Sequence, residues 1–418
     1  MFSKIFLLVL AITFYIHPQN KILIFMDLKQ TDHLKAYGVT FHALEKGLKS
    51  DWLLNYRGGS FMIDYSDDIA NECRVDGVAF NVISTAQAAD IYSYVQSDDQ
   101  NMSVVRLEKA PKIAVFVPPG FQPWDDAVTM VLEYANIPYT KIWNDEILRG
   151  DLSKYDWLHL HHEDFTGQYG KFYGSFRNAQ WYIDNQMMYE QDAKKNGFKK
   201  VSNMMKAVAM DIKNYVGQGG FLFAMCSATD SYDIALAAQN VDICAEMYDG
   251  DPADPDAQSK LDFSNTLAFT NFKLEMNPYV YEYSNIDVQP AEIGNPDNDY
   301  FTLFDFSAKY DPVPTMLTQD HVNVIKGFMG QTTMFHKELI KKSVIILAER
   351  PGTDQVKYIH GNYGRGTFTF YGGHDPEDYQ HMVGDPPTDL SLHKNSPGYR
   401  LILNNVLFPA AQKKKQKT

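Results

Sequence analysis

The sequence predicts an α/β protein built on a doubly wound, mostly parallel sheet, with a smaller α/β region before it. Short apolar segments typical of strands alternate with longer segments of helical spacing, and glycines and prolines separate them. The chain has 418 residues, enough for two domains or for one large domain with insertions. Ligands of such sheets bind beyond the carboxyl ends of the strands. The residues that follow the predicted strands are therefore the first candidates for a site.

Residues 20–105 are predicted to form the smaller α/β region. Residues 32–46 indicate a helix, because their apolar side chains recur at helical spacing. The other expected elements are strands at 21–26, 51–56, 60–63 and 78–83 and a helix at 85–96, with the second and third strands paired around Gly58 and Gly59.

Residues 110–410 are predicted to form the larger domain. The stretches 163–200 and 249–342 show few clear periodicities, and we interpret them as insertions over the strand ends. Residues 411–418 form a basic tail. The expected strands are 112–117, 139–143, 156–161, 221–225, 343–348, 357–360 and 367–371, and the expected helices are 124–134, 204–216, 231–238 and 398–407.

The N-terminus has the pattern of an export signal, which we assign to residues 1–19. Lys4 supplies a positive charge, and residues 5–16 form an apolar run too short to span a bilayer. An uncleaved anchor is the competing interpretation. No later segment of the sequence has the length and apolarity of a membrane span. We therefore expect an exported protein, either periplasmic or secreted.

The charge balance of the chain argues against nucleic-acid binding. With 38 Lys and Arg against 52 Asp and Glu, the net charge is −14, whereas phosphate contacts need clustered basic residues. The only basic cluster is the tail, which we interpret as a solvated terminus. Aromatic residues make up 14% of the chain, which suits hydrophobic cores and sugar- or peptide-facing clefts equally. The expected partner is a small molecule, a peptide or a glycan. The oligomeric state is left open.

Cys226 is the strongest candidate for a nucleophile. An apolar strand at 221–225 leads into it, and Ala224 and Ala228 flank it at two residues on either side. Small flanking residues are what a sharp strand-to-helix turn requires, and the free N–H groups of the following helix favour a thiolate. The alternative is a small buried hydrophobe. We expect that role for Cys73 and Cys244, and a disulfide between those two is left open.

His374 follows the predicted strand at 367–371 and is the candidate base for Cys226. An imidazole can take the proton of a thiol, and a carboxylate usually orients the imidazole. Glu377 or Asp375 could supply that carboxylate. The backbone N–H groups of the elbow, which includes Ser227, would stabilise an oxyanion in the substrate-binding region. The alternative is that Cys226 packs under the sheet and His374 caps a turn.

A run of polar side chains follows another predicted strand. We expect His161, His162 and Glu163 to line the rim of the same cleft. Histidine and carboxylate ligands could also hold a metal here. Alternate strand residues point in opposite directions, so not all of them can face one point, although a loop could bring two together. A purely structural role is the remaining alternative. The acidic stretch 249–256 could wrap calcium, although a solvated turn is favoured. We therefore expect neither a metal nor another cofactor.

Residues 112–409 resemble the class I glutamine-amidotransferase-like superfamily. The resemblance rests on Cys226 at its elbow and on His374 after a later strand. It implies a flavodoxin-like fold, with Cys226 as nucleophile, His374 as base and Glu377 as orienting carboxylate. Two features depart from the family pattern. Alanines replace the usual glycines beside the cysteine, and Glu377 lies one residue further from His374, so Asp375 is an alternative partner.

The whole chain is also similar to exported bacterial proteins often labelled asparagine synthetase B. That synthetase uses an N-terminal cysteine and a Ser-Gly-Gly-x-Asp-Ser type loop for pyrophosphate, whereas residue 2 here is Phe and the sequence contains no such loop. We therefore predict a cysteine-dependent amide or ester hydrolase. The alternatives are a non-catalytic scaffold that binds a glycan or peptide, and a glutamine-dependent asparagine synthetase, which these residues disfavour.

Overall fold

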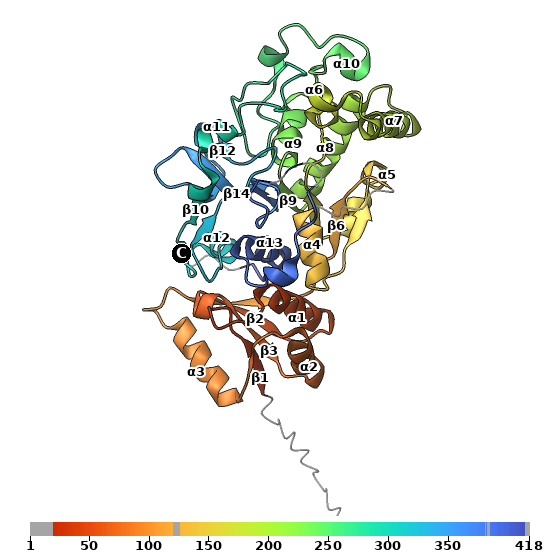
Figure 1. Ribbon diagram of the computed structural model, residues 1–418. Coiled ribbons are helices and arrows are strands. Elements are labelled where there is room, and N and C mark those ends of the chain that lie inside the picture. Colours follow the sequence, from red (N-terminus) through yellow and green to blue (C-terminus); the bar gives the residue numbers. More distant parts are fainter. Residues whose placement is uncertain (1–19, 120–125, 381, 383–384, 414–418) are drawn as a thin grey trace, which may run out of the picture.

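The computed structural model describes residues 20–119, 126–380, 382 and 385–413 (Figure 1). The expected signal peptide and residues 414–418 of the basic tail lie outside the described residues. A smaller sheet near the N-terminus lies below a larger sheet in the view of Figure 1, with helices between the two.

Within residues 20–119, five strands form the smaller sheet in the order β4-β1-β3-β2-β5, and every pair is antiparallel. Alternate side chains of β1 enter different cores. Ile22 and Ile24 pack with α1 and α2, whereas Leu23 packs on the side of α3. The elements are β1 (Lys21–Ile24), α1 (His33–Glu45), β2 (Ser50–Leu54), β3 (Ser60–Asp64), α2 (Asp67–Asp76), β4 (Asn81–Ile83), α3 (Thr85–Gln96) and β5 (Ser103–Leu107).

In the described part of the chain, the larger sheet has ten strands in the order β11-β10-β13-β14-β15-β9-β8-β6-β7, with β12 paired to β14 off this path. Its strands are β6 (Ile113–Phe116), β7 (Thr140–Ile142), β8 (Trp157–Leu160), β9 (Phe221–Met225), β10 (Tyr300–Leu303), β11 (Val324–Lys326), β12 (Phe335–His336), β13 (Ile345–Glu349), β14 (Gln355–Tyr363) and β15 (Gly366–Tyr371).

The expected doubly wound, mostly parallel sheet is wrong. The strands β15, β9, β8, β6 and β7 pair in parallel, but β11, β10, β13, β14 and β12 pair antiparallel, as does the whole smaller sheet. The reason is the length of the connections. β14 reaches β15 through a turn at Gly364, and a parallel pair would need a crossover of a dozen or more residues. Residues 249–342 supply three strands of this antiparallel half.

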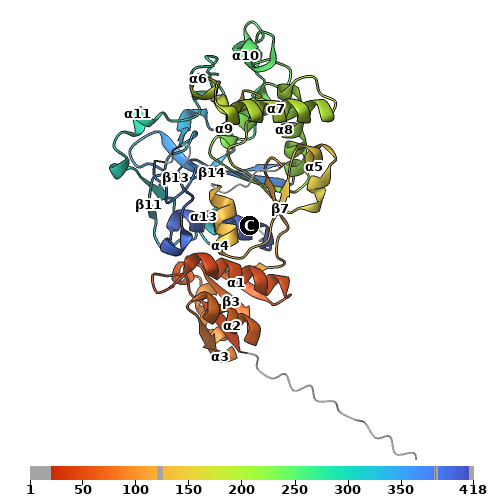
Figure 2. The same ribbon diagram turned by 45° about the vertical axis from the view of Figure 1, so that its right-hand side comes forward.

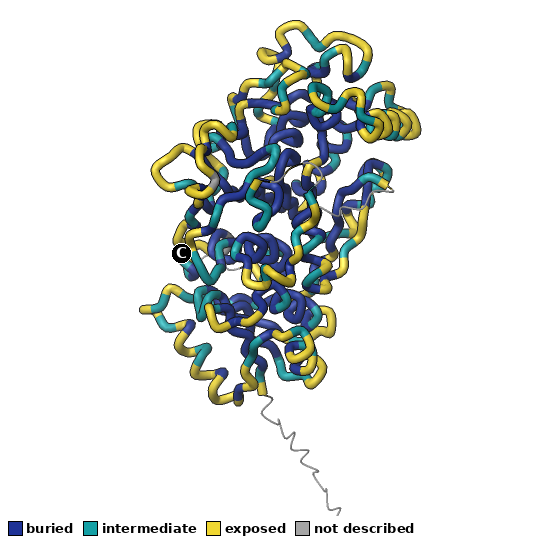
Figure 3. The backbone as a smooth tube through the Cα atoms, viewed as in Figure 1, coloured by how far each residue is buried: buried dark blue, intermediate teal, exposed yellow. Residues whose placement is uncertain are grey.

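Helices cover both faces of the larger sheet (Figures 1 and 2). One face packs on α4 (Ala127–Tyr134) and α13 (Pro397–Leu407), which also contact α1 of the smaller region. The other face packs on α8 (Val201–Gly217) and α9 (Ala228–Ala237). The strand β9 contributes side chains to the cores on both faces, Phe221 and Phe223 on the first and Leu222 on the second. Figure 3 shows α9 and α13 deeply buried and α3 mostly exposed.

The remaining helices are short or lie at the periphery. They are α5 (Asn144–Leu148), α6 (Tyr173–Phe176), α7 (Gln180–Lys195), α10 (Glu246–Asp249), α11 (Pro290–Ile293) and α12 (Pro312–Leu317). Among the described residues, none of the helices combines the length and the apolarity that crossing a membrane requires.

Arg400 of α13 joins the two regions. Its side chain is fully buried. It donates hydrogen bonds to the hydroxyl of Tyr37 (3.0 Å) and to the carbonyls of Met26 (3.1 Å) and Gly58, all from the smaller region. Asp320 of the larger region lies 3.8 Å away and balances its charge. A buried charge is tolerated only when it is paired and hydrogen-bonded, so this contact fixes the docking of the two regions.

We expect Arg400→Ala to lower the free energy of unfolding by roughly 3–5 kcal/mol, because it removes the guanidinium that balances the buried carboxylate of Asp320 and leaves two backbone carbonyls without this donor. Urea denaturation of the full chain measures this loss. Arg365→Ala, which removes an exposed arginine, is the control and should change stability by less than about 0.5 kcal/mol. Equal losses in the two variants would contradict the assigned role of Arg400.

Candidate active site

The carboxyl ends of three neighbouring strands meet at one edge of the larger sheet. β9 pairs in parallel with β8, where Leu160 faces Ala224, and with β15, where Tyr371 faces Met225. The residues that follow these strands are therefore close in space. They are His161 and His162 after β8, Cys226 and Ser227 after β9, and the segment from Gly372 to His374 after β15.

Cys226 forms the strand-to-helix turn that the sequence predicts. Its φ of 48° lies in the left-handed region, which is uncommon for a residue other than glycine. Its N–H donates to the carbonyl of Gly373 at 3.1 Å, and its carbonyl accepts from the N–H (3.1 Å) and the hydroxyl (2.6 Å) of Thr229. These bonds hold the strained turn directly beside the segment that carries His374.

The sulfur of Cys226 lies in a buried but polar environment. Only 2% of the residue is exposed. Burial raises the pKa of its thiol to about 11, although the backbone N–H groups of Thr332, Gln331 and Ser227 point to the sulfur and favour the thiolate. The rise in the thiol pKa caused by burial is thus larger than the lowering that we expected from the helix N-terminus. At neutral pH the thiol keeps its proton and needs a base to become a nucleophile.

Gly330 packs between the thiol and His374. A Cβ atom at this residue would lie 3.1 Å from the sulfur of Cys226 and 2.8 Å from the backbone nitrogen of His374. A side chain here would collide with the backbone, so glycine is the residue that fits. The segment 330–332 therefore covers the sulfur and supplies two of the N–H groups that point to it.

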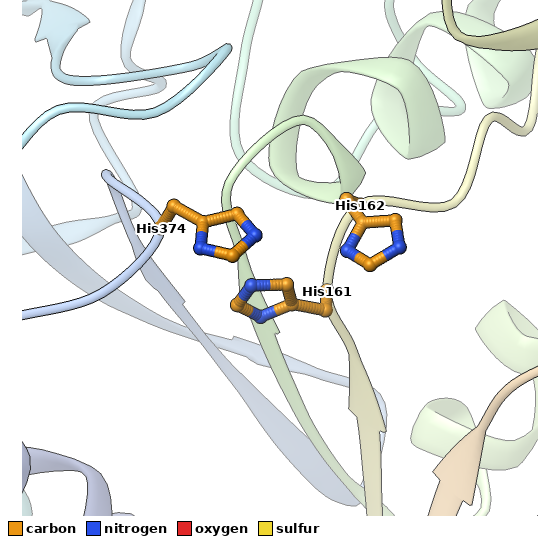
Figure 4. Close-up of side chains that lie close together, drawn as sticks. All are labelled: His161, His162 and His374. Carbon is orange, nitrogen blue, oxygen red and sulfur yellow. The ribbon is translucent and has the colours of Figure 1, made fainter. Parts of the chain in front are cut away.

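Three imidazoles gather beside this turn (Figure 4). The ring centroids of His161 and His374 are 4.4 Å apart, with the rings nearly perpendicular. The rings of His162 and His374 are almost parallel, at 5.9 Å. His161 and His374 are buried, whereas His162 is exposed. Of the predicted rim residues, the two histidines thus lie beside the candidate base.

A buried carboxylate that the sequence reasoning missed lies behind the histidines. Asp126 caps the N-terminus of α4 by accepting from the N–H groups of Val128 and Thr129, and it contacts the Nε2 of His159 at 3.1 Å. Its oxygen lies 3.7 Å from the Nδ1 of His161. Burial acts to raise the pKa of Asp126, but the charge of His159 and these hydrogen bonds outweigh it and lower the pKa. The sequence predicts a helix over 124–134 that includes Asp126, whereas α4 begins directly after it. An acidic residue near the start of that helix was the available signal for an N-cap.

The two carboxylates predicted to orient His374 have other partners. Glu377 lies 3.0 Å from the Nδ1 of His393 and accepts from the hydroxyl of Tyr379 at 3.4 Å. Asp375 is buried and accepts from the hydroxyls of Thr388 (2.6 Å) and Tyr399 (2.7 Å). Asp375 therefore connects the segment after β15 to α13. Both carboxylates stabilise the conformation of this segment.

Glu163 and Ser227 hold the loop after β8 in place. The carboxylate of Glu163 accepts from the backbone N–H of His161 at 2.9 Å, and burial raises its pKa. The hydroxyl of Ser227 donates to the carbonyl of His162 at 3.3 Å, and the N–H of Ala228 donates to the carbonyl of His161 at 3.1 Å. Both residues thus position the histidines, and the backbone N–H of Ser227 faces the sulfur.

Ionisable groups near the thiol were also missed: Asp230 and Lys357 are buried, and the half-buried Glu282 lies close to Asp230. Asp230 accepts from the hydroxyl of Thr332 at 3.0 Å, and burial together with the charge of Glu282 raises the pKa of Asp230 to about 8. Burial likewise raises the pKa of Glu282 to about 7. Lys357 donates to the carbonyls of Phe328 and Thr333, and burial lowers its pKa to about 7. Each of these shifts favours the neutral form of the group, because charge is costly in a buried site.

The other predicted features have structural roles. All three cysteines lie in described segments, and all are free and buried, so Cys73 and Cys244 are confirmed as buried thiols without a disulfide between them. In the acidic stretch 249–256, the ammonium of Lys200 lies beside Asp249 and Asp251 and also contacts Asp242. A lysine thus already supplies positive charge where calcium was the alternative.

No family model and no curated protein matches this chain. Among solved structures, it is similar to the cytoplasmic protein STM1381 from Salmonella typhimurium LT2, with 11% identity and a TM-score of 0.36 over 72% of this chain and 100% of that chain. A second, the cytoplasmic protein STM3548 from Salmonella typhimurium, has 9% identity and a TM-score of 0.35 over 72% and 100%. The beta-galactosidase from Bacillus circulans sp. alkalophilus has 11% identity and a TM-score of 0.27 over 70% and 32%. Likenesses this weak carry no argument about fold or activity.

The buried carboxyl of Asp230 makes a prediction about pH and stability. Its folded pKa of about 8 lies above the ordinary value of 3.8, so between these values the folded state holds a proton that the unfolded state has lost. Stability should therefore fall as pH rises from 5 to 7, by roughly 1 kcal/mol per pH unit from this group. Asp230→Asn should remove that part of the slope in urea denaturation. Thr332→Val, which leaves Asp230 able to titrate, should keep it, and equal slopes in wild type and Asp230→Asn would contradict the assignment.

Proposed function

We propose that this chain is an exported cysteine-dependent hydrolase of the amidotransferase-like kind, with Cys226 as nucleophile and His374 as base, acting on an amide or ester. The observation that carries the proposal is the hydrogen bond from the N–H of Cys226 to Gly373, which joins the strained cysteine turn to the residue before His374. A nucleophile and its base need such proximity. Export rests on the pattern of residues 1–19 alone.

In the proposed reaction, His374 takes the proton of the Cys226 thiol while the sulfur bonds to the substrate carbonyl carbon. The electron pair of the C=O bond moves to oxygen. The N–H of Ser227, which points to the sulfur in this structure, would turn to that oxygen and stabilise it. When the C=O bond re-forms, the amine or alcohol leaves with the proton from His374. Water then attacks the thioester, gives a proton to His374 and releases the acid, and His374 returns that proton to sulfur.

The orienting carboxylate in this scheme is Asp126. Glu377 and Asp375 are engaged with His393 and Tyr399, whereas Asp126 lies 3.7 Å from the ring of His161, which packs edge-on against His374. Asp126 therefore acts through His161 as a positioning residue. The segment 330–332 must shift for a carbonyl to reach the sulfur, because it covers the thiol in this structure.

A non-catalytic binding protein is the second candidate, and a cluster of aromatic rings favours it. Rings from the two stretches predicted as insertions pack together, Phe172 on Tyr281 (5.2 Å) and Tyr173 on Tyr279 (5.7 Å). Tyr279 is 61% exposed and Tyr281 is 42% exposed. Gln331 connects this cluster to the thiol site, because its side-chain amide donates to the carbonyl of Tyr281. Such rings suit the binding of a glycan or an aromatic peptide.

A chromogenic aryl ester tests the catalytic proposal, since it reports attack by any activated thiol. We expect hydrolysis by the wild-type chain, loss of activity in Cys226→Ala, and a loss of about 10²–10⁴-fold in His374→Ala, because a general base contributes that much. Intact mass spectrometry should find the acyl group on Cys226.

Cys244→Ala is the matched control, because Cys244 is also a buried thiol but its sulfur donates to the carbonyl of Thr166 at 3.2 Å. This variant should keep full activity. Hydrolysis that persists in Cys226→Ala, or an acyl group found on another residue, would refute the catalytic proposal and favour the binding protein.

A further inference from the structure

The proposed thiol chemistry uses His374 as its base, but the three imidazoles at the sheet edge together also form a possible metal-ligand set. One ring nitrogen from each of His161, His162 and His374 can be chosen so that all lie within 4.8 Å of one another. Figure 4 shows the rings facing a common space, with two residues from the loop after β8 and one from the loop after β15. Two separate segments of the chain therefore place the same donor type at one point.

Three imidazole donors favour a particular class of metal ion. Neutral imidazole is a preferred ligand of Zn²⁺ and of other late transition metals such as Co²⁺ and Ni²⁺. Zn–N bonds of 2.0–2.1 Å in a tetrahedron place nitrogens about 3.4 Å apart. Metal binding would draw these nitrogens together from their present spacing, which is within 4.8 Å, to that value. Three protein ligands leave a fourth position open, the pattern of a catalytic rather than a purely structural zinc site.

The backbone around each ligand is already fixed. The N–H of His161 donates to Glu163 at 2.9 Å, and its carbonyl accepts from Ala228 at 3.1 Å. The carbonyl of His162 accepts from Ser227, and the N–H of His374 donates to the carbonyl of Met329 at 2.8 Å. Ligands held in this way need little ordering when a metal binds, so less affinity is lost.

A carboxylate completes the surroundings of the ligand set. Asp126 lies 3.7 Å from the Nδ1 of His161. Metal-binding histidines usually offer their second nitrogen to such a carboxylate, which fixes the ring and makes it a better donor. The exposed His162 gives an ion access from solvent, while the other two ligands are buried.

We propose that His161, His162 and His374 bind one Zn²⁺-type transition-metal ion, with Asp126 as the carboxylate that orients His161. Metal binding uses no sulfur, so it does not depend on the hydrolase proposal. It does engage His374, so a bound ion withdraws the base from Cys226. The metal-bound chain and the thiol-active chain are then alternative states of one site.

A second set of donors nearby, Asp126 with His159 and His161, has the same spacing. We do not assign the ion there. Asp126 already accepts from the N–H groups of Val128 and Thr129 and contacts His159, and all members of the set are buried. The two assignments make different predictions for His162, which belongs only to the first.

The experiment titrates Zn²⁺ into the metal-free full chain by calorimetry and follows Co²⁺ by its visible absorption. We expect one ion per chain and a Co²⁺ spectrum of low coordination number. His162→Ala should weaken binding at least about 100-fold, because it removes one of three ligands, and its exposure makes the substitution compatible with folding. Asp126→Asn should weaken binding by about 10–100-fold.

His336→Ala is the control, since this half-buried histidine lies near Glu292 and Asp354, away from the set. It should bind as the wild type does, and so should Cys226→Ala, whatever its effect on ester hydrolysis. No saturable binding of one ion per chain would overturn the proposal. An unchanged affinity for Zn²⁺ in His162→Ala would also overturn it, because the ion would then lie in the buried set of Asp126, His159 and His161.

Discussion

The parallel pairing of β9 with β8 on one side and with β15 on the other is the constraint on which the site depends. Parallel neighbours in register end together, so His161, Cys226 and the segment before His374 leave the sheet at the same edge. Helices α8 and α9 cover one face of these strands and α4 covers the other, which leaves the strand ends as the place where polar side chains meet. A slip of one residue in either pairing would turn the strand side chains to the wrong faces and separate the site.

Burial sets the chemistry at this edge. Cys226, Asp230 and Lys357 are all almost completely inaccessible, and each shifts toward its neutral form because a low-dielectric interior disfavours unpaired charge. A thiol in this setting cannot rest as a thiolate and reacts only when a base removes its proton. That physical condition makes the position of the histidines, rather than the helix N-terminus behind Cys226, the decisive feature of the site.

The same three histidines can serve two chemistries, and the arrangement explains why they compete. His374 is the base in the proposed hydrolysis and a ligand in the proposed metal site, and one nitrogen lone pair cannot do both at once. Asp126 supports either role, since it acts on His161 and not on the sulfur. Metal supply would then select the state of the site, with the aromatic cluster of Tyr279 and Tyr281 remaining beside it in both states.

The sequence by itself determined the local features of this protein. Apolar periodicity located α1 and most strands of the larger sheet, and the small residues around Cys226 indicated its turn, because both depend on neighbours along the chain. The direction of β13 and β14, the placing of Asp126 behind His161 and the cover over the sulfur at Gly330 were decided only by the tertiary structure. Each depends on contacts between residues far apart in the sequence, which local periodicity does not encode.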